Sequence, residues 1–351
     1  MRALVLETFG GPLEVRDVPA PACPPSGAVI RVEATGVCRS DWHGWQGHDD
    51  GITVPHVPGH ELAGTVVKVG ADVRSWRAGD RVTVPFVCAC GTCDACLAGE
   101  QQVCEHQTQP GFTHWGSFAE RVAIDHADVN LVALPDGMSA VTAASLGCRF
   151  ATAYRAVTVH ARVQPGQWLA VHGCGGVGLS AVMVAVAAGA RVVALDVRPE
   201  ARDAALGLGA EVALDPGAGA TAESLGALVR AATDGGAHAS VEALGDPVTA
   251  AGSVLGLRRR GRHVQVGLLL VEHARTALPM DRVVGWELEV YGSHGMAAHE
   301  YPAMLAAVAS GALAPDRLVG AVVGLDEAGA ALAAMGSPSS QTGAGMTVVV
   351  P

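Results

Sequence analysis

Residues 169–189 read LAVHGCGGVGLSAVMVAVAAG: an apolar run of strand length, a glycine-rich turn and an alanine-rich helical pattern. Three glycines of the turn form a G-x-G-x-x-G pattern. The first permits the tight turn, the second lets the backbone approach a pyrophosphate, and the third lets the helix pack close to the strand. The start of the helix offers unpaired N–H groups to the anion. We therefore predict a dinucleotide site with the turn residues Gly173, Gly175, Gly176, Val177 and Gly178.

The next apolar run indicates which dinucleotide binds. It reads RVVALD and ends at Asp196, whose carboxylate would accept hydrogen bonds from the adenosine ribose. A carboxylate at this position repels a ribose 2′-phosphate, which favours NAD over NADP. Arg198 would either pair with Asp196 or bind such a phosphate, so NADP stays an alternative.

The pattern of the middle segment continues to residue 292. Apolar runs of strand length alternate there with alanine-rich helical stretches. Six strands with intervening helices imply right-handed crossovers and a doubly wound parallel sheet of the Rossmann type. We assign residues 150–291 to this coenzyme domain. We expect the arginine cluster at 258–262 to form the solvated end of a helix.

The flanking segments have a different pattern. The first hundred or so residues contain short alternating strands broken by Gly and Pro, which is typical of a β-rich, barrel-like unit. After Gly292 the chain has one helix-like segment and a final strand, MTVVVP, which we expect to pack back onto the first unit. We therefore assign residues 1–149 and 292–351 to one domain.

Composition excludes several classes of partner. Asp and Glu number 34 against 23 Lys and Arg, which argues against a protein that binds nucleic acid. The apolar run at the N-terminus is broken by Glu7 before it could form the core of a secretory signal. The uncharged stretch 168–190 contains His172 and clustered glycines, which favours a buried strand, turn and helix over a membrane span. We expect a cytoplasmic protein that binds neither nucleic acid nor membranes.

Four of the nine cysteines form one cluster, C-x-x-C-x-x-C-x7-C. Four thiolates in a single loop can close a tetrahedral zinc site with no position left for a substrate, so we expect a structural zinc. Two disulfides or an iron–sulfur cluster are the alternatives. Cys88, just upstream, is an alternative ligand, but we expect it to be a small strand residue. The members of the cluster are Cys90, Cys93, Cys96 and Cys104.

Three further segments read GVCRSDWHGW (36–45), PGHELAG (58–64) and LGCRFATAY (146–154). Together with the cysteine loop and the glycine-rich turn, in this order, they resemble the medium-chain, zinc-dependent alcohol dehydrogenases over essentially the whole chain. The resemblance implies an α/β protein: a GroES-like, β-rich catalytic domain and a Rossmann coenzyme domain. It also supplies what spacing alone does not, namely that these distant segments meet in space.

The resemblance implies that Cys38, His60 and Cys148 bind a second, catalytic zinc. Two thiolates and one imidazole leave the fourth position open for an alcohol. Glu61 matches the family's carboxylate beside the zinc, which would ligate the metal transiently; a structural ion pair is the alternative.

The resemblance also implies a proton relay. Ser40 matches the hydroxyl that takes the substrate proton, and His43 matches the imidazole that passes it to solvent through the nicotinamide ribose. Histidine suits this task because its ordinary pKa lies near 6.5. An ordinary surface histidine is the alternative for His43.

Four more residues match supporting positions of the family. Asp41 would bind the imidazole of a zinc ligand, here His60, and fix its tautomer. Arg39 matches a contact to the pyrophosphate and Thr152 a contact near the nicotinamide. Phe86 would form a wall of the substrate pocket or belong simply to the core.

Two residues depart from the family pattern. Cys174 in the glycine-rich turn is either an oxidisable thiol or a small buried residue. Thr347 stands where the family often has an arginine that contacts the coenzyme, so that contact is in doubt.

These observations predict an enzyme that interconverts primary or secondary alcohols with aldehydes or ketones, using NAD and two zinc ions per chain. A polyol-type dehydrogenase is one alternative, although those proteins usually have Glu where Cys148 stands. A non-catalytic protein that binds NAD and zinc is the other. The family commonly pairs its coenzyme domains through the last strand, here near Glu287 to Tyr291, so we expect a homodimer or homotetramer.

Overall fold

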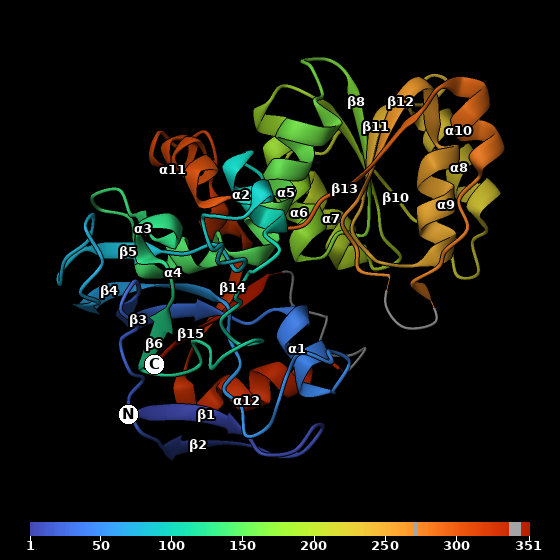
Figure 1. The fold of residues 1–351 in the computed structure, drawn as a ribbon. Coiled ribbons are helices and arrows are strands. Elements are labelled where there is room, and N and C mark those ends of the chain that lie inside the picture. The colour runs from blue at the N-terminus through green and yellow to red at the C-terminus, as the bar shows by residue number, and fades with distance from the viewer. Residues whose placement is uncertain (270–272, 337–344) are drawn as a thin grey trace. The chain divides into compact units, whose positions relative to one another are not determined.

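The computed structural model describes residues 1–269, 273–336 and 345–351. The chain divides into two compact units (Figure 1). The first unit comprises Met1–Ala151 and Gly295–Pro351, and the second comprises Thr152–His294.

Within the described residues, the second unit is built on a six-stranded parallel sheet. Its strand order, β10-β9-β8-β11-β12-β13, is that of two mononucleotide-binding halves whose order reverses between β8 and β11. The prediction of a doubly wound parallel sheet is confirmed. The strands are β8 (Trp168–His172), β9 (Arg191–Leu195), β10 (Val212–Leu214), β11 (Ala237–Glu242), β12 (Leu257–Gln265) and β13 (Glu289–Gly292).

Helices cover both faces of this sheet (Figure 1). On one face, Trp168 and Ala170 of β8 pack with Leu225 of α8 and Val254 of α9. On the other face, α6 and α7 lie against β8, β9 and β10. Because both faces are covered, the central strands β8 and β9 are almost entirely apolar and buried. The helices are α6 (Gly176–Ala187), α7 (Pro199–Gly207), α8 (Ala222–Ala232), α9 (Pro247–Leu255) and α10 (Met280–Trp286), with a π-helical segment η2 (Ala156–Ala161) before β8.

The arginine cluster at 258–262 lies in strand β12 and not at a helix end, so that prediction is wrong. Arg259 and Arg260 are exposed, whereas Arg262 donates a hydrogen bond to the carbonyl of Ala161 at 2.9 Å. A run of arginines has no apolar alternation that would mark a strand. Pairing with β11 on one side and β13 on the other decides the structure here.

The uncharged stretch 168–190 forms β8, the glycine-rich turn and α6. The helix has 12 residues, and most of its side chains are buried. In the described ranges of the chain, no helix is long and apolar enough to cross a membrane.

The first unit contains a seven-stranded sheet in its described part. The order is β14-β15-β3-β4-β5-β7, and β6 pairs with β3. Ile30, Leu62, Val82 and Ile124 belong to its buried core. The strands are β3 (Ala28–Gly36), β4 (Glu61–Val69), β5 (Arg81–Thr83), β6 (Arg121–Ile124), β7 (Val132–Ala133), β14 (Val319–Gly324) and β15 (Met346–Val350), and β1 (Arg2–Leu6) with β2 (Leu13–Asp17) forms a separate antiparallel hairpin.

Short helices connect these strands. Two of them, α1 and α5, begin beside Cys38 and at Cys148, which are candidate metal ligands. The helices are α1 (Arg39–Trp45), α2 (Asp94–Leu97), α3 (Ala127–Asn130), α4 (Ala140–Ser145), α5 (Cys148–Arg155), which ends in the second unit, α11 (Tyr301–Ala309), α12 (Leu325–Ala334) and the 3₁₀ segments η1 (Gln101–Val103), η4 (Ala298–Glu300) and η5 (Pro315–Leu318).

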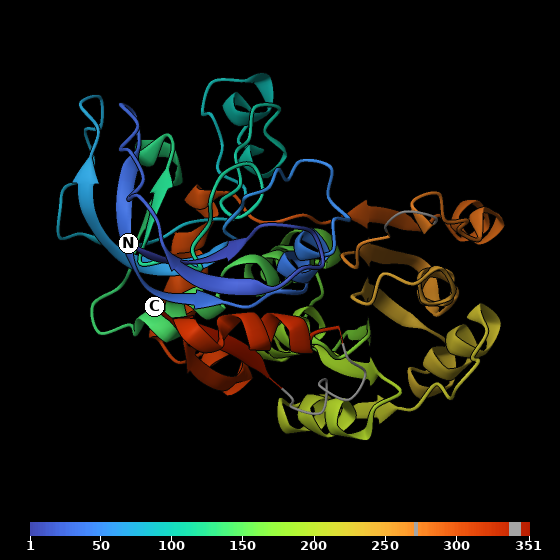
Figure 2. The ribbon, with the colours of Figure 1, turned by 90° about the horizontal axis from the view of Figure 1, so that it is seen from below.

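The C-terminal segment is richer in structure than its sequence indicates. The final strand β15 pairs antiparallel with β3, and the sequence analysis missed β14 and α12. Leu325 and Leu332 of α12 share a buried cluster with Leu4 of β1. Figures 1 and 2 show α12 (red) against the β1–β2 hairpin (blue). The helix reads LDEAGAALAA, and so many Ala and Gly residues leave only a weak apolar stripe.

Candidate metal and coenzyme sites

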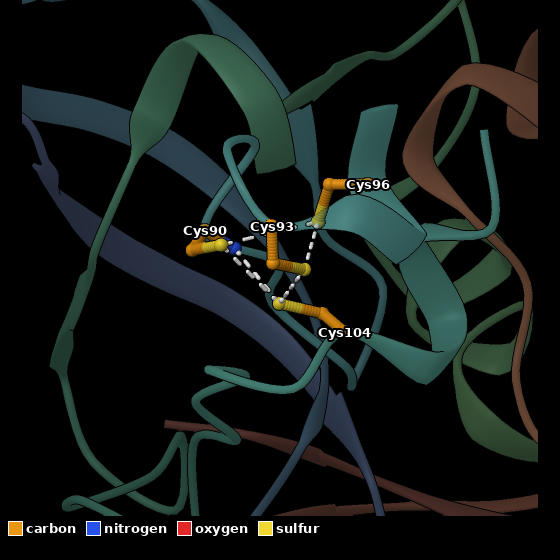
Figure 3. Close-up of side chains that lie close together, drawn as sticks. All are labelled: Cys90, Cys93, Cys96 and Cys104. Atoms are coloured by element: carbon orange, nitrogen blue, oxygen red, sulfur yellow. Dashed lines mark hydrogen bonds between the residues drawn. The ribbon is translucent and has the colours of Figure 1, made fainter. Parts of the chain in front are cut away.

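The four clustered cysteines converge in one loop of the first unit. Their sulfur atoms point toward one another (Figure 3), with Sγ–Sγ distances of 3.4 Å for Cys93–Cys96, 3.5 Å for Cys90–Cys104, 3.7 Å for Cys93–Cys104 and 4.0 Å for Cys90–Cys96. Zinc held by four thiolates at about 2.3 Å would separate them by about 3.8 Å. All four are free thiols, and the donor set fits a tetrahedral zinc.

The loop also provides hydrogen-bond donors to two of its sulfurs. Thr92 approaches the Cys90 Sγ with its hydroxyl at 3.5 Å and its backbone N–H at 3.4 Å, and these hydrogen bonds lower the pKa of Cys90 to about 5. Cys104 Sγ accepts a hydrogen bond from the backbone N–H of Cys90 at 3.3 Å. Donors aimed at sulfur stabilise thiolates, which are the form that binds zinc.

Asn130, which the sequence analysis missed, holds this loop in place. Its Oδ1 accepts a hydrogen bond from the backbone N–H of Ala89 at 2.7 Å, and its Nδ2 donates to the carbonyl of the same residue at 2.9 Å. Asn130 is buried at the end of α3, so this bidentate contact fixes the segment that leads into Cys90. No sequence motif distinguishes this asparagine from one in a turn.

A second group of possible ligands gathers from three distant segments. One ligand atom from each of Cys38, His60, Glu61 and Cys148 lies within 4.8 Å of the others. Cys38 precedes α1, His60 precedes β4, and Cys148 begins α5. The structure therefore brings together the segments that spacing alone could not join.

Asp41 organises two of these ligands at once. Its Oδ1 lies 2.8 Å from Nδ1 of His60, and its Oδ2 accepts the backbone N–H of Cys38 at 2.9 Å. Asp41 and His60 are fully buried. Nε2 of His60 has no hydrogen-bond partner among the described residues, and a buried imidazole held in this way presents its other nitrogen to a metal. Burial lowers the pKa of His60, but the Asp41 carboxylate outweighs it and raises that pKa well above the ordinary value.

The two sulfurs of this group interact directly. Their hydrogen bond lowers the pKa of Cys38 well below its usual value and raises that of Cys148 well above it. Cys38 is buried, so two thiolates here would repel one another without a cation between them. The donor set of two sulfurs and one ring nitrogen fits a zinc site with one open position.

Glu61 is held by a partner that the sequence analysis did not identify. Arg149 donates to Oε1 of Glu61 through its backbone N–H at 3.0 Å and its Nε at 3.1 Å, and to Oε2 through Nη2 at 2.5 Å. Burial raises the pKa of Glu61, and the Arg149 guanidinium opposes that rise. Glu61 thus forms a buried ion pair and also lies beside the other ligand atoms.

The two predicted relay residues both follow Cys38 on α1, but they have different neighbours. Ser40 Oγ lies 3.7 Å from the sulfur of Cys38. His43 is half-buried, and its Nδ1 lies 3.0 Å from Nδ1 of His48, which the sequence analysis did not single out. Burial, together with Arg39 and His48, lowers the pKa of His43 to about 4. Among the described residues, no hydrogen bond joins Ser40 to His43.

Arg39 and Phe86 are two further predicted site residues of the first unit. The guanidinium of Arg39 stacks on the ring of Trp42 at 4.3 Å and donates a hydrogen bond to the carbonyl of Met335. Phe86 is buried, and its ring meets that of His60 edge-on with centroids 6.0 Å apart. The phenylalanine therefore lies next to the candidate metal ligands.

The glycine-rich turn of the second unit has the geometry that its pattern predicts. Gly173 has a φ of +87°, and a Cβ on Gly178 would lie 1.8 Å from the carbonyl oxygen of Gly173. A Cβ on Gly175 would meet nothing within 4 Å. Gly175 is the N-cap of α6, and no side chain caps that helix. The backbone N–H groups at this helix start fit a pyrophosphate.

Asp196 follows β9 beside this turn. Its Oδ2 accepts the backbone N–H of Cys174 at 2.8 Å, and its Oδ1 accepts the backbone N–H of Arg198 at 2.9 Å and the Nε of Arg198 at 3.2 Å. Of the two roles considered for Arg198, the structure shows the pairing with Asp196. Thr152 is buried in α5 at the start of this unit, and its carbonyl accepts a hydrogen bond from Ser293.

The two departures from the family pattern also have defined surroundings. Cys174 is buried, and burial raises the pKa of its thiol to about 12, so it is a small buried residue and not a reactive thiolate. Thr347 lies in β15, where its carbonyl accepts the backbone N–H of Val37 at 2.9 Å.

Family models match two parts of the chain. Residues 24–136 match the alcohol dehydrogenase GroES-like domain, and residues 176–310 match the zinc-binding dehydrogenase domain. An alcohol dehydrogenase of Geobacillus stearothermophilus is 38% identical over 220 residues, which are 61% of this chain and 63% of that protein. An NAD-dependent alcohol dehydrogenase of Sulfurisphaera tokodaii is 37% identical over 224 residues, 61% of this chain and 64% of that protein. The chain thus spans slightly less than two thirds of the length of these curated relatives.

Solved structures match over the full length. An alcohol dehydrogenase from Thermus sp. ATN1 is 32% identical, with a TM-score of 0.88 and coverage of 100% of this chain and 99% of that one. A cobalt- and zinc-bound alcohol dehydrogenase from Pyrobaculum aerophilum is 26% identical, with a TM-score of 0.83 and the same coverage.

Proposed function

Because the chain belongs to the zinc-dependent, medium-chain alcohol dehydrogenase family, we propose that it interconverts primary or secondary alcohols with aldehydes or ketones, with NAD as hydride carrier. One observation carries this proposal. Cys38, His60 and Cys148 converge from three distant segments, and Nε2 of His60 is buried with no partner among the described residues. A protein that merely binds zinc has no need of a three-residue donor set with an open position.

Zinc in this site would act as a Lewis acid that lowers the pKa of an alcohol in the open position. The residues Cys38, His60 and Cys148 would hold the ion, and Asp41 keeps the imidazole of His60 in the tautomer that binds. Arg149 keeps the Glu61 carboxylate in an ion pair. In the resting site the charge of Glu61 therefore does not compete with the other ligands for the zinc ion.

The proton released by the alcohol would pass to this chain's own groups. Ser40, beside the sulfur of Cys38, accepts and donates through one hydroxyl, and His43 carries the proton onward. Burial keeps His43 neutral at neutral pH, because its pKa is lowered to about 4, so its ring is ready to accept.

The coenzyme would bind the second unit. NAD would supply the hydride acceptor, and the turn at Gly173 to Gly178 would bind it, with the pyrophosphate at the start of α6. Asp196 would receive the adenosine ribose, and Arg39 and Thr152 would add contacts to the coenzyme. The cysteine loop at 90–104 would hold the second, structural zinc.

We also propose a homodimer or homotetramer and a cytoplasmic location. β13 is the last strand in the order of its sheet, and an unpaired edge can pair with a second copy. None of the nine cysteines, all within the described residues, forms a disulfide, which suits a reducing compartment. Size-exclusion chromatography with light scattering tests the assembly.

A panel of primary, secondary and aromatic alcohols, incubated with NAD while the absorbance of NADH is followed, tests the activity. Cys38→Ser should abolish turnover and reduce the zinc content from two ions per chain to one, with NAD affinity unchanged. Cys104→Ser is the matched control. It should also lose one zinc ion, but its main effect should be a lower free energy of unfolding. Full activity of Cys38→Ser would refute the ligand assignment.

A further inference from the structure

Two histidine rings meet at the exposed end of α1. Nδ1 of His43 lies 3.0 Å from Nδ1 of His48, and the ring centroids are 5.3 Å apart. His43 is half-buried and His48 is exposed, so the pair joins a partly buried position to solvent. Neither the motif around Cys38 nor the family resemblance assigns a role to His48.

The backbone fixes this pair. The N–H of His48 donates to the carbonyl of His43 at 3.0 Å, and Gly47 between them has a φ of +77°, which turns the chain back on itself. The indole of Trp42 packs edge-on against both rings, with centroid distances of 5.1 Å to His43 and 5.8 Å to His48. The contact therefore results from a closed turn and a shared aromatic neighbour.

A distance of 3.0 Å between two ring nitrogens requires that one donates and the other accepts. A neutral imidazole carries one N–H and one lone pair, on different nitrogens. If Nδ1 of His43 carries the N–H, its Nε2 is free to accept a proton, while His48 accepts at Nδ1 and carries its own proton on Nε2. Such a pair can move a proton from one end to the other without moving either ring.

We propose that His48 is the outer member of a two-imidazole proton relay, which receives at Nδ1 the proton that His43 gives up when it accepts another at Nε2. This proposal rests on the proposed alcohol dehydrogenase function. During alcohol oxidation a bond forms between the incoming proton and Nε2 of His43. The Nδ1–H bond of His43 breaks as a new Nδ1–H bond forms on His48, whose Nε2–H proton leaves to water. Reduction of an aldehyde or ketone runs the same steps in reverse, so charge and protons balance.

The charged groups around His43 and its burial favour passing a proton on over holding it. Burial is the main cause that lowers the pKa of His43 to about 4, and the Arg39 guanidinium and His48 add to it, while the Cys38 sulfur opposes them. A proton therefore does not stay on His43 at neutral pH. Asp49 and Asp50 follow His48 in the sequence, and the Asp49 carboxylate accepts the backbone N–H of Gly51. Met335, which caps the end of α12, accepts a hydrogen bond from Arg39 through its carbonyl.

The kinetic test compares His48→Gln with wild type in the transient formation of NADH from an alcohol that the enzyme oxidises, between pH 6 and pH 9. We expect the variant to be slower by about 10-fold near pH 6 and to approach wild type toward pH 9, where hydroxide replaces the relay. Added imidazole should restore the rate at low pH. His299→Gln, which removes another exposed imidazole of the first unit, should behave as wild type. A deficit of His48→Gln that is independent of pH, or no deficit, would overturn the proposal.

A double variant tests whether the two rings act as one unit. His43→Gln with His48→Gln should be no slower than His43→Gln alone, because removal of the inner ring already breaks the path. Additive losses would show that His48 acts independently and would overturn the relay.

A measurement without substrate separates this inference from the proposed function. In zinc-loaded protein free of coenzyme, the ¹⁵N resonances of histidine followed through a pH titration report the protonation of each ring. His48→Gln should raise the pKa of His43, because it removes a neighbouring positive charge. An unchanged His43 pKa would overturn the coupling. If no alcohol is oxidised by wild type, the proposed function fails, while this titration still decides whether the two rings are coupled.

Discussion

At the scale of single residues, Asp196 shows how one carboxylate can serve both the fold and a ligand. It accepts backbone N–H groups of Cys174 and Arg198, and it also accepts the Nε of Arg198. Its side chain is almost buried, while that of Arg198 is about one third exposed. The nearby guanidinium offsets part of the negative charge that would reject a 2′-phosphate. The preference for NAD over NADP therefore depends on the balance within this pair.

Changing Asp196 to Asn should shift the preference toward NADP by about 10-fold, because an amide removes the charge repulsion while it keeps an acceptor for one of the two backbone N–H groups. Arg198→Ala should lower the use of NADP and leave that of NAD nearly unchanged. The ratio of kcat/KM with NAD to that with NADP measures both changes. An unaltered ratio in Asp196→Asn would exclude a role for this carboxylate in the choice of coenzyme.

At the scale of elements, the glycines of the turn between β8 and α6 have two different roles, packing and ligand access. Gly178 is needed for packing, because its position has no room for a Cβ against the carbonyl of Gly173. Gly175 has open space beside it, so the fold does not require glycine there. If a pyrophosphate is to reach the helix start, that space has to stay open.

Alanine at these two positions should therefore have different effects. Gly175→Ala should weaken NAD binding by about 10-fold or more, with little change in the free energy of unfolding, because the methyl group occupies ligand space. Gly178→Ala should destabilise the unit itself, since overpacking against backbone costs about 1–3 kcal/mol. Calorimetric titration with NAD and urea denaturation measure the two effects. Equal losses of stability in both variants would contradict this division.

At the scale of the whole molecule, buried histidines make stability depend on pH. His172 in β8 is fully buried, neither of its ring nitrogens has a hydrogen-bond partner among the described residues, and burial lowers its pKa to about 3. His263 in β12 is also buried, with a pKa lowered to about 4. An unfolded histidine titrates near 6.5, so between these pH values the unfolded chain binds more protons. The contribution of these two histidines to the free energy of unfolding should therefore be fully retained above about pH 6.5 and decrease as the pH falls toward 3.

His172→Leu should remove part of this dependence. Relative to wild type, the variant should gain about 2 kcal/mol more stability at pH 5 than at pH 8, because leucine has no proton to take up on unfolding. Urea midpoints in excess zinc at both pH values provide the measurement. His299→Leu, at an exposed position, is the control and should leave the slope unchanged. Parallel stability curves for His172→Leu and wild type would show that this ring does not control the acid sensitivity.

The sequence determined the coenzyme unit and the four-cysteine loop almost completely. A strand covered on both faces is apolar, and a tight turn that leads into a helix requires glycine. The local sequence is therefore enough to predict β8, the turn and α6. Four cysteines within one short loop also need no distant partner. By contrast, α12 and β14 were missed, because an alanine-rich helix has little apolar periodicity and a strand of five or six residues depends on its neighbours.

Only the tertiary structure decided how distant side chains meet. No local pattern shows that Arg149 closes on Glu61, that Asp41 ties the backbone of Cys38 to the ring of His60, or that Asn130 supports the cysteine loop. The pairing of His43 with His48 likewise requires a turn at Gly47 that closes the two rings together. Sequence records which groups are present, but their energies of interaction depend on distance and burial, and these are fixed only when the chain is folded.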